Sequence, residues 1–442
     1  MGHQTSSTLV RHQRWYAVLC LHVSWLVGVS LFKGLGVMLP SLTDQFSAET
    51  WMVGWMVAIV AGVAGLTGPL TGPLVALIGP RTAVMASGLA LGTSMALSSV
   101  ATSVVQMALI LSLVAGPALV VPVILTRTLV GNHFTENYAI ANGIASSGSS
   151  VGLVFVAPFT QLLLDTYGWR GTMLLLGGLC MHLAVCGALL QSSPISETSK
   201  HTYEELSRES EQLLGRKVSG KKKTSCFQAI LATLAHQLGC SVCLRASFWL
   251  ATVVLICFRF VPSLWLVYFV SQAQSMGFSA YDATIFTTAA GVGNSVIKIS
   301  LGLAVDRGFL SLRWALLLSI LGAAGTLLSS SWMKAYWLMM VDAFFHYGFV
   351  GVVSSLCDIY TRELVGIDNL GSALSWMELM AAILQLAFGF FPGWIYDETG
   401  SFDLAFFVMG GMLTLPLVSL LLEWVMMGNS KNVDESRPFA DR

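Results

Sequence analysis

Charged residues are scarce in this chain. Only 10% of its 442 residues are Asp, Glu, Lys or Arg, and the 23 basic residues balance the 23 acidic ones. A typical soluble domain carries about 25% charged residues. So few charges cannot cover a water-facing surface, whereas a surface that faces lipid needs no polar coat. The zero net charge also gives no sign of a nucleic-acid partner.

Signatures of several other protein classes are missing as well. The eight cysteines lie in apolar segments or in the long polar loop, which gives no sign of a disulfide framework. No Gly-rich phosphate-binding motif occurs in a polar segment, which argues against ATP-driven transport. The polar residues within the apolar segments form no Ser/His or His/Asp cluster of recognised spacing. We therefore expect no enzyme activity, no cofactor and no metal site.

Long apolar runs are what the chain does have. Hydrophobic residues make up 55% of it, and about twenty such residues in a row cross the roughly 30 Å of a bilayer core as a helix. We therefore predict an all-α membrane protein with twelve transmembrane helices. The predicted spans are 15–42, 51–78, 82–101, 104–129, 138–163, 170–192, 247–275, 281–304, 311–331, 335–359, 370–393 and 402–427.

One long polar segment divides these spans into six and six. The resulting regions are an N-terminal tail 1–14, a first half 15–192, a central loop 193–246, a second half 247–427 and a C-terminal tail 428–442. With the N-terminus inside, seventeen Lys and Arg residues fall on the cytoplasmic side and two fall outside. Cytoplasmic loops carry such an excess of basic residues. Both termini and the central loop are therefore predicted to be cytoplasmic.

An internal repeat supports two related halves. The fifth predicted span ends in Asp165-Thr-Tyr-Gly168, and the eleventh ends in Asp397-Glu-Thr-Gly400. The two sites are six spans apart, and a Gly-Gly pair follows each of them. Internal repeats of this kind are typical of secondary transporters.

The segment Gly302-x3-Asp306-Arg307, after the eighth span, resembles the loop signature of the major facilitator superfamily. Arg313 stands where the signature continues to further basic residues, and only Gly79-Pro80-Arg81 remains of its counterpart after the second span. The resemblance implies that Asp306 and Arg307 form a gating loop, which stabilises one state of a rocking carrier.

The stretch from Phe134 to Gly171 resembles the fifth-span region of the monocarboxylate transporter family. It reads Phe134-x5-Ile140-Ala141-Asn142-Gly143-Ile144-Ala145-x2-Gly148-Ser149-x2-Gly152, then Ala157-Pro158 and Gly168-Trp169-Arg170-Gly171. Two segments depart from the family pattern, which makes the chain a divergent member. The acidic motif that opens the first span is replaced by His12–Val18, and the basic cluster before the fifth span by Thr135–Tyr138.

Two lysines lie within predicted spans, where a charge is costly and hence a functional candidate. Lys33 stands where proton-coupled family members have a substrate-facing lysine, although it could also snorkel to the outer interface. Lys298 lies one helical turn after Asn294, where the family has an arginine one turn after an aspartate. The resemblance therefore implies that Lys33, Asn294 and Lys298 bind substrate. Since an amide takes up no proton, proton coupling is in doubt.

Other polar residues within the spans allow alternatives. Arg259 could hold a substrate carboxylate or pair with Asp342 or Glu378. Asp342, His346 and Glu378 form a possible proton relay, while a structural hydrogen-bonded pair of Asp342 and His346 is the other reading.

Arg127 lies near the cytoplasmic end of its span, and we expect it to snorkel to the surface. Four cations within the spans then face two acids, Asp342 and Glu378. This excess of positive charge favours a carboxylate-bearing solute.

The predicted function is alternating-access transport of a small carboxylate-bearing solute across the plasma membrane. The alternative is a transport-inactive sensor or scaffold of the same fold, which the loss of the acid at Asn294 favours. Some members of the family travel with a single-span immunoglobulin-type glycoprotein, so the resemblance leaves such a partner open.

Overall fold

The computed structural model describes residues 2–134, 138–190, 240–366 and 369–435, and every regular element in these ranges is helical. The N-terminal group of helices is α1 (Gly2–Phe46), α2 (Thr50–Thr67), α3 (Thr71–Ile78), α4 (Pro80–Ser98), α5 (Val104–Ile110), α6 (Gly116–His133), α7 (Tyr138–Cys180) and α8 (His182–Leu189). The C-terminal group is α11 (Ala246–Ser275), α12 (Ala280–Asp306), α13 (Leu312–Ser329), α14 (Tyr336–Val365), α15 (Leu370–Phe388), α16 (Phe391–Thr399), α17 (Asp403–Met412) and α18 (Leu415–Glu435).

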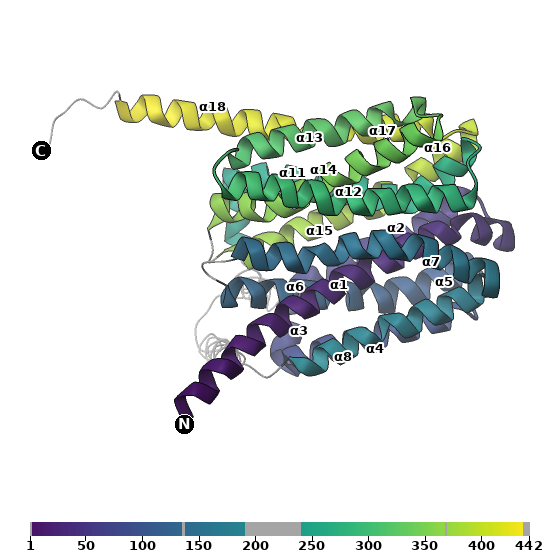
Figure 1. The fold of residues 1–442 in the computed structure, drawn as a ribbon, viewed down its shortest axis with the longest axis horizontal. Coiled ribbons are helices and arrows are strands. Elements are labelled where there is room, and N and C mark those ends of the chain that lie inside the picture. Colours follow the sequence, from purple (N-terminus) through teal and green to yellow (C-terminus); the bar gives the residue numbers. More distant parts are fainter. Residues whose placement is uncertain (1, 135–137, 191–239, 367–368, 436–442) are drawn as a thin grey trace, which may run out of the picture.

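The helices run side by side along the long axis of the molecule (Figure 1). The N-terminal group forms one side of the bundle and the C-terminal group forms the other. The beginning of α1 and the end of α18 lie at the same end of the bundle, which we call the termini end. The turn between α1 and α2 lies at the opposite end, which we call the far end.

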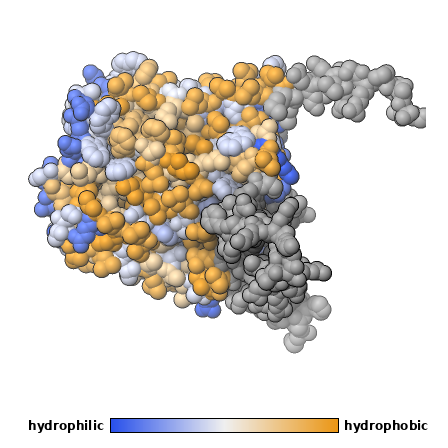
Figure 2. Space-filling view, turned by 180° about the vertical axis from the view of Figure 1, so that it is seen from behind, coloured by the Kyte–Doolittle hydropathy of each residue, from blue (hydrophilic) through white to orange (hydrophobic). Residues whose placement is uncertain are grey.

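The outer surface of the bundle is apolar. Large hydrophobic side chains such as Leu77, Phe155, Leu162 and Trp424 are more than half exposed. Figure 2 shows hydrophobic residues over most of one face, with hydrophilic residues gathered toward the ends. An apolar belt of this kind is suited to lipid. The predicted all-helical membrane fold is therefore confirmed.

Ten helical stretches among the described residues are long and apolar enough to cross a membrane. One of them, Ala141–Leu189, covers both of the predicted spans 138–163 and 170–192. The predicted span 82–101 corresponds to α4, which is not among the ten. Most of the predicted central loop and the end of the C-terminal tail lie outside the described residues, whereas α18 continues to Glu435 and so includes the start of that tail.

The glycines of the repeated D-x-x-G segments both have a positive φ, but their ψ angles differ, 177° at Gly168 and 7° at Gly400. Gly168 interrupts α7 with a φ of 66°, and Gly400 ends α16 with a φ of 70°. Glycine adopts this left-handed backbone region at little cost, because it has no Cβ atom. The two glycines therefore reverse the chain at matching places in the two groups of helices.

The two groups pack together mainly along three helix pairs, α1 with α11, α2 with α15, and α7 with α12, and α2 also contacts α16. Close approach within the N-terminal group also depends on small residues. A Cβ atom on Gly148 of α7 would lie 2.0 Å from the carbonyl oxygen of His22 on α1. Gly152, one turn further along, also lies against α1, whereas Gly143 has no neighbour within 4 Å of such an atom.

Candidate functional site

A cavity of about 280 Å³ lies between the two groups of helices. Side chains from α1, α2, α6 and α7 line one side, and side chains from α11, α12, α14 and α15 line the other. On α1 the lining runs from Ser24 to Phe32, and on α14 it runs from Tyr347 to Asp358. These ranges occupy the middle of the bundle and its termini half. The cavity is therefore placed toward the termini end, and the helices close over it toward the far end.

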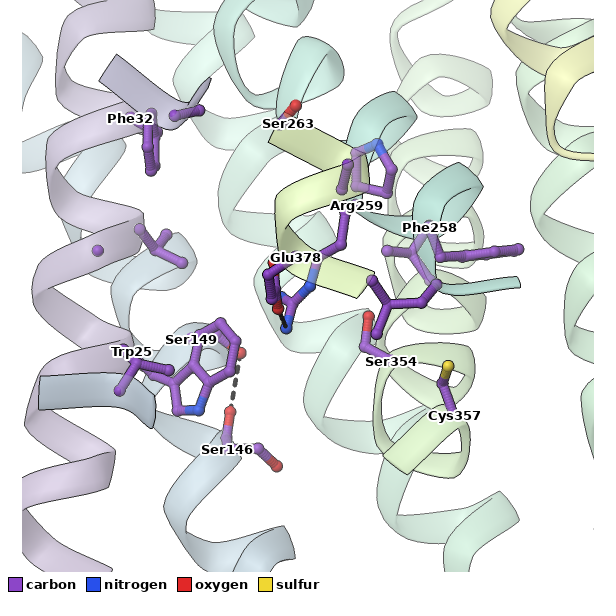
Figure 3. Close-up of a pocket in the computed structure, with 18 of the residues that line it drawn as sticks. Trp25, Phe32, Ser146, Ser149, Phe258, Arg259, Ser263, Ser354, Cys357 and Glu378 are labelled. Atoms are coloured by element: carbon purple, nitrogen blue, oxygen red, sulfur yellow. Dashed lines mark hydrogen bonds and ion pairs between the residues drawn. The ribbon is translucent and has the colours of Figure 1, made fainter. Parts of the chain in front are cut away.

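Arg259 and Glu378 bind each other in the wall of the cavity (Figure 3). A nitrogen of the Arg259 guanidinium lies 2.7 Å from Oε1 of Glu378. Arg259 comes from α11 and Glu378 from α15, and both side chains are partly exposed to the cavity. Of the acids considered from the sequence, Glu378 is thus the one that pairs with Arg259.

Arg127 forms a second ion pair in the cavity wall. Its Nη2 donates to both carboxylate oxygens of Asp358, at 2.8 and 2.6 Å, and its Nη1 lies 3.9 Å from Glu378. The pair joins α6 to α14, and both side chains are less than 10% exposed. The expectation that Arg127 snorkels to the surface is therefore wrong, because a buried carboxylate of the other group of helices binds it.

Asp358 was overlooked as an intramembrane acid, although it lies within the predicted span 335–359. It adds a third acid to Asp342 and Glu378, and Glu423, within the predicted span 402–427, is a further one. The sequence alone could not show that Arg127 is buried against a helix of the other group. The position of an aspartate inside a predicted span was a signal that could have been used.

The indole of Trp25 lies close to both guanidiniums. The central carbon of Arg127 is 5.4 Å from a Trp25 ring centroid, and that of Arg259 is 5.2 Å from one. Both distances are within the range of cation–π attraction. Trp25 belongs to α1, so it links Arg259 of the C-terminal group to the N-terminal group of helices.

Lys298 lines the cavity without an acidic partner. Its Nζ donates to the backbone carbonyl of Ser146 at 3.3 Å, and among the described residues no carboxylate oxygen lies within 4 Å of it. Asn294, one turn earlier on α12, also lines the cavity and presses against Gly351 of α14. The Oδ1 atom of Asn294 is buried and accepts no hydrogen bond from the described residues.

Lys33 is placed differently from Lys298. Its side chain is fully buried, and its Nζ donates to the carbonyl of Leu266 at 3.3 Å. The rings of Trp265 and Phe269 lie 5.2 and 5.5 Å from this nitrogen. The neighbouring Phe32 lines the cavity whereas Lys33 does not. Lys33 therefore neither faces the cavity nor snorkels in this conformation.

Asp342 and His346 lie on the side of α14 that faces α13. Asp342 accepts a hydrogen bond of 3.4 Å from Ser329, and Nδ1 of His346 lies 3.1 Å from the hydroxyl of Thr326. Neither residue lines the cavity, and Glu378 lies within it. The structure thus does not bring the three members of the predicted relay together.

The predicted gating loop lies at the termini end of α12. Asp306 is the last residue of that helix and Arg307 follows it, and both are exposed. Among the described residues neither forms an ion pair within 4 Å. Arg313 instead binds Glu423 of α18 at 2.7 Å, and the hydroxyl of Tyr360 donates to the same carboxylate.

The family model of the Major Facilitator Superfamily matches residues 21–349, about three quarters of the chain. The chain belongs to the major facilitator superfamily. Monocarboxylate transporters are among its relatives, and the chain spans about three fifths to two thirds of their length. Monocarboxylate transporter 12 of Mus musculus is 30% identical over 302 residues, which are 67% of this chain and 61% of that protein. Monocarboxylate transporter 2 of Homo sapiens is 24% identical over 334 residues, which are 74% of this chain and 67% of that protein.

A solved structure of the D-xylose-proton symporter shares the superfamily fold. It matches with a TM-score of 0.68 at 14% identity, over 92% of this chain and 97% of the symporter chain. These relatives of the superfamily are transporters rather than enzymes.

Proposed function

We propose that this member of the major facilitator superfamily is a secondary transporter. It moves a small monocarboxylate, or a related carboxylate-bearing solute, across the plasma membrane by alternating access. The observation that carries the proposal is the position of Lys298, a cation on the wall of a central cavity with no acidic partner within 4 Å among the described residues. A carboxylate of the solute supplies the missing partner.

The other two cations of the cavity support this role for Lys298. Arg259 is bound by Glu378, and Arg127 is bound by Asp358. Each of these guanidiniums is therefore neutralised by the protein itself. An incoming carboxylate would have to displace an existing partner there, whereas at Lys298 it replaces only a contact with a backbone carbonyl. The excess of positive charge is thus confined to one point of the cavity.

The transporter crosses the membrane twelve times. The apolar helix α4 adds one crossing, and the turn at Gly168 divides the long Ala141–Leu189 stretch into two. The domain boundaries are those of the predicted regions, with two six-helix halves. The termini end is cytoplasmic, because most basic residues outside the spans fall on that side. The cavity then faces the cytoplasm in this conformation.

Proton coupling through the α12 pair is absent. Asn294 stands one turn before Lys298, and its amide cannot take up a proton. Asp358 and Glu378 are the acids of the cavity wall, and arginines hold both of them. We therefore expect the solute to move without an obligatory proton, with Lys298 and Asn294 contacting it.

Uptake into vesicles that contain the purified full chain tests the proposal. Labelled monocarboxylates, amino acids and creatine-like compounds are supplied with and without a pH gradient. We expect saturable uptake of one carboxylate class, and Lys298→Gln to reduce uptake at low solute concentration by roughly thirtyfold or more, since unpairing a buried charge costs about 2–5 kcal/mol. Lys334→Gln, which changes an exposed lysine outside the cavity, is the matched control.

Two results would contradict the proposal. One is uptake of the carboxylate that Lys298→Gln leaves unchanged. The other is the absence of saturable uptake for every compound while the chain stays folded, which would favour the transport-inactive sensor or scaffold. Uptake that strictly requires a proton gradient would contradict only the statement that the solute moves without an obligatory proton.

A further inference from the structure

The first turn of α2 is capped by a carboxylate from the other group of helices. The backbone N–H of Trp51 donates to Oδ2 of Asp397 at 2.9 Å, and that of Thr50 donates to Oδ1 at 3.3 Å. Asp397 belongs to α16, at the far end of the bundle (Figure 1). The contact therefore joins the two groups at the end opposite the cavity opening.

The start of α2 has no side-chain cap of its own. The residue at the N-cap position is Glu49, and its side chain accepts from the indole of Trp51 instead of from a backbone N–H of the first turn. The first backbone N–H groups of a helix have no partner within the helix, and a carboxylate there binds them and opposes the positive end of the helix dipole. Asp397 supplies both effects.

The residues around Asp397 form a tight seam between α2 and the pair α15–α16. The indole N–H of Trp55 donates to the carbonyl of Leu386 at 3.1 Å. A Cβ atom on Gly393 would lie 2.6 Å from the Cα of Trp51, so the two backbones touch. The ring of Phe390 packs against both indoles, with centroids 6.4 Å apart in each case.

The internal repeat provides a comparison within the same chain. Asp165 occupies the place in the first half that Asp397 occupies in the second. Its carboxylate accepts from the side chain of Gln161 in its own helix, at 2.8 Å. The start of α12, the counterpart of α2, is capped locally, because Ser279 and Asp282 form a reciprocal capping box. One of the two equivalent seams is thus bridged by a carboxylate of the other group, and the other is not.

We propose that Asp397 is a latch that holds the far end of the carrier closed by capping α2 across the two halves. Opening of the far end separates α2 from α15 and α16, so the Thr50 and Trp51 amides lose this partner in the open state. The cap then stabilises the closed state alone. At the seam between α7 and α12, Ser279 and Asp282 cap α12 locally, and no carboxylate bridges the seam in this way among the described residues. The latch rests on these contacts and not on the identity of the solute.

Hydrogen exchange of the full chain in lipid nanodiscs, followed by mass spectrometry, tests the latch without any substrate. Asp397→Ala is compared with Asp165→Ala, the equivalent change in the other half. Because the loss of a cap costs about 0.5–2 kcal/mol, we expect Asp397→Ala to raise exchange roughly tenfold along residues 50–62 and 383–395. Asp165→Ala is expected to leave both segments unchanged. Trp55→Phe, which removes the indole donor and keeps the ring, is expected to raise exchange in the same two segments.

Three results would overturn the latch. Faster exchange of Asp397→Ala that is confined to residues 50–53 would show a local helix cap and no effect on the seam. An equal effect of Asp165→Ala would show that the two seams are alike. Unchanged exchange in both segments would show that Asp397 does not hold the far end closed. If Asp397→Ala does not fold, Asp397→Asn, which keeps one acceptor oxygen, is used instead. It is expected to show a smaller increase of exchange in the same segments, and unchanged exchange there would likewise reject the latch.

Discussion

At the scale of single residues, the charges buried between the two groups of helices differ in how they are satisfied. Arg127 and Arg259 each have a carboxylate within 2.8 Å. Lys33 and Lys298 have backbone carbonyls as hydrogen-bond acceptors instead. A paired charge is part of the structure, because removing one member leaves the other uncompensated. Of the two lysines, Lys298 lines the cavity and is therefore the one available to a ligand.

The Arg127–Asp358 ion pair is expected to contribute to the stability of the protein. Asp358→Asn replaces the carboxylate by a neutral amide, and we expect it to lower the free energy of unfolding by about 3–5 kcal/mol. The double variant Arg127→Met/Asp358→Leu removes both charges and is expected to recover most of that loss. Thermal unfolding in detergent measures both effects. A double variant no more stable than Asp358→Asn would contradict the pairing.

For Lys33, in contrast to Asp358, we expect that removing the charge does not lower stability. The ammonium is fully buried beside the stacked rings of Trp265 and Phe269 and has no carboxylate within 4 Å among the described residues. Replacing an uncompensated buried charge by an apolar side chain of similar length is neutral or stabilising. We therefore expect Lys33→Met to keep or raise the melting temperature. A melting temperature lowered by several degrees would assign Lys33 a structural role here.

At the scale of helices, packing depends on close contact between α12 and α14. A Cβ atom on Gly293 would lie 2.0 Å from the carbonyl oxygen of Phe344. Because the neighbour is backbone, it cannot move aside as a flexible side chain would. The same face of α12 carries Asn294 and, one turn further, Lys298. The spacing between these two helices therefore positions the residues that line the cavity.

We expect Gly293→Ala to destabilise the protein by about 1–3 kcal/mol, since it overpacks the contact. Gly302→Ala is the control on the same helix, because its Cβ atom would meet nothing within 4 Å. That substitution should leave stability unchanged or raise it by up to about 1 kcal/mol, since alanine favours the helix. Melting temperatures of the two variants give the comparison, and equal values would exclude a tight helix contact at Gly293.

At the scale of the whole molecule, the position of the cavity defines a conformation. The lining residues lie in the middle of the bundle and toward the termini end, while α1 and α11 meet toward the far end. A Cβ atom on Gly36 of α1 would lie 2.6 Å from the carbonyl oxygen of Leu266 on α11. This contact leaves no path for a solute between these two helices.

Accessibility of Ser354 tests that conformation. This residue lies within α14 and lines the cavity, and it is nevertheless exposed. We expect Ser354→Cys, in a chain otherwise free of cysteine, to react with a membrane-impermeant thiol reagent added on the side of the termini. The reagent added on the other side should react at least about tenfold more slowly, as expected for a minor state populated at 10% or less. Equal rates from both sides would exclude a closed far end.

The sequence by itself determined the class of the protein and most of its helices. Twenty-residue apolar runs with few charges have only one stable form in lipid, a spanning helix, because every backbone N–H and C=O must be satisfied within it. The predicted span 247–275 accordingly corresponds to α11, Ala246–Ser275. The left-handed turns at Gly168 and Gly400 also follow from local rules, since the repeated motif places glycine where the chain reverses.

Only the tertiary structure decided which charges meet. Arg127 and Asp358 are 231 residues apart, and Thr50 and Asp397 are 347 residues apart. Whether such a residue finds a partner, reaches the surface or faces a cavity depends on how two distant helices are rotated and placed against each other. The pattern of apolar residues along a helix does not predict that placement, because a charged residue within a span is compatible both with snorkelling and with a buried ion pair. The packing of the two groups of helices shows that carboxylates bind Arg127 and Arg259, whereas Lys298 contacts a backbone carbonyl.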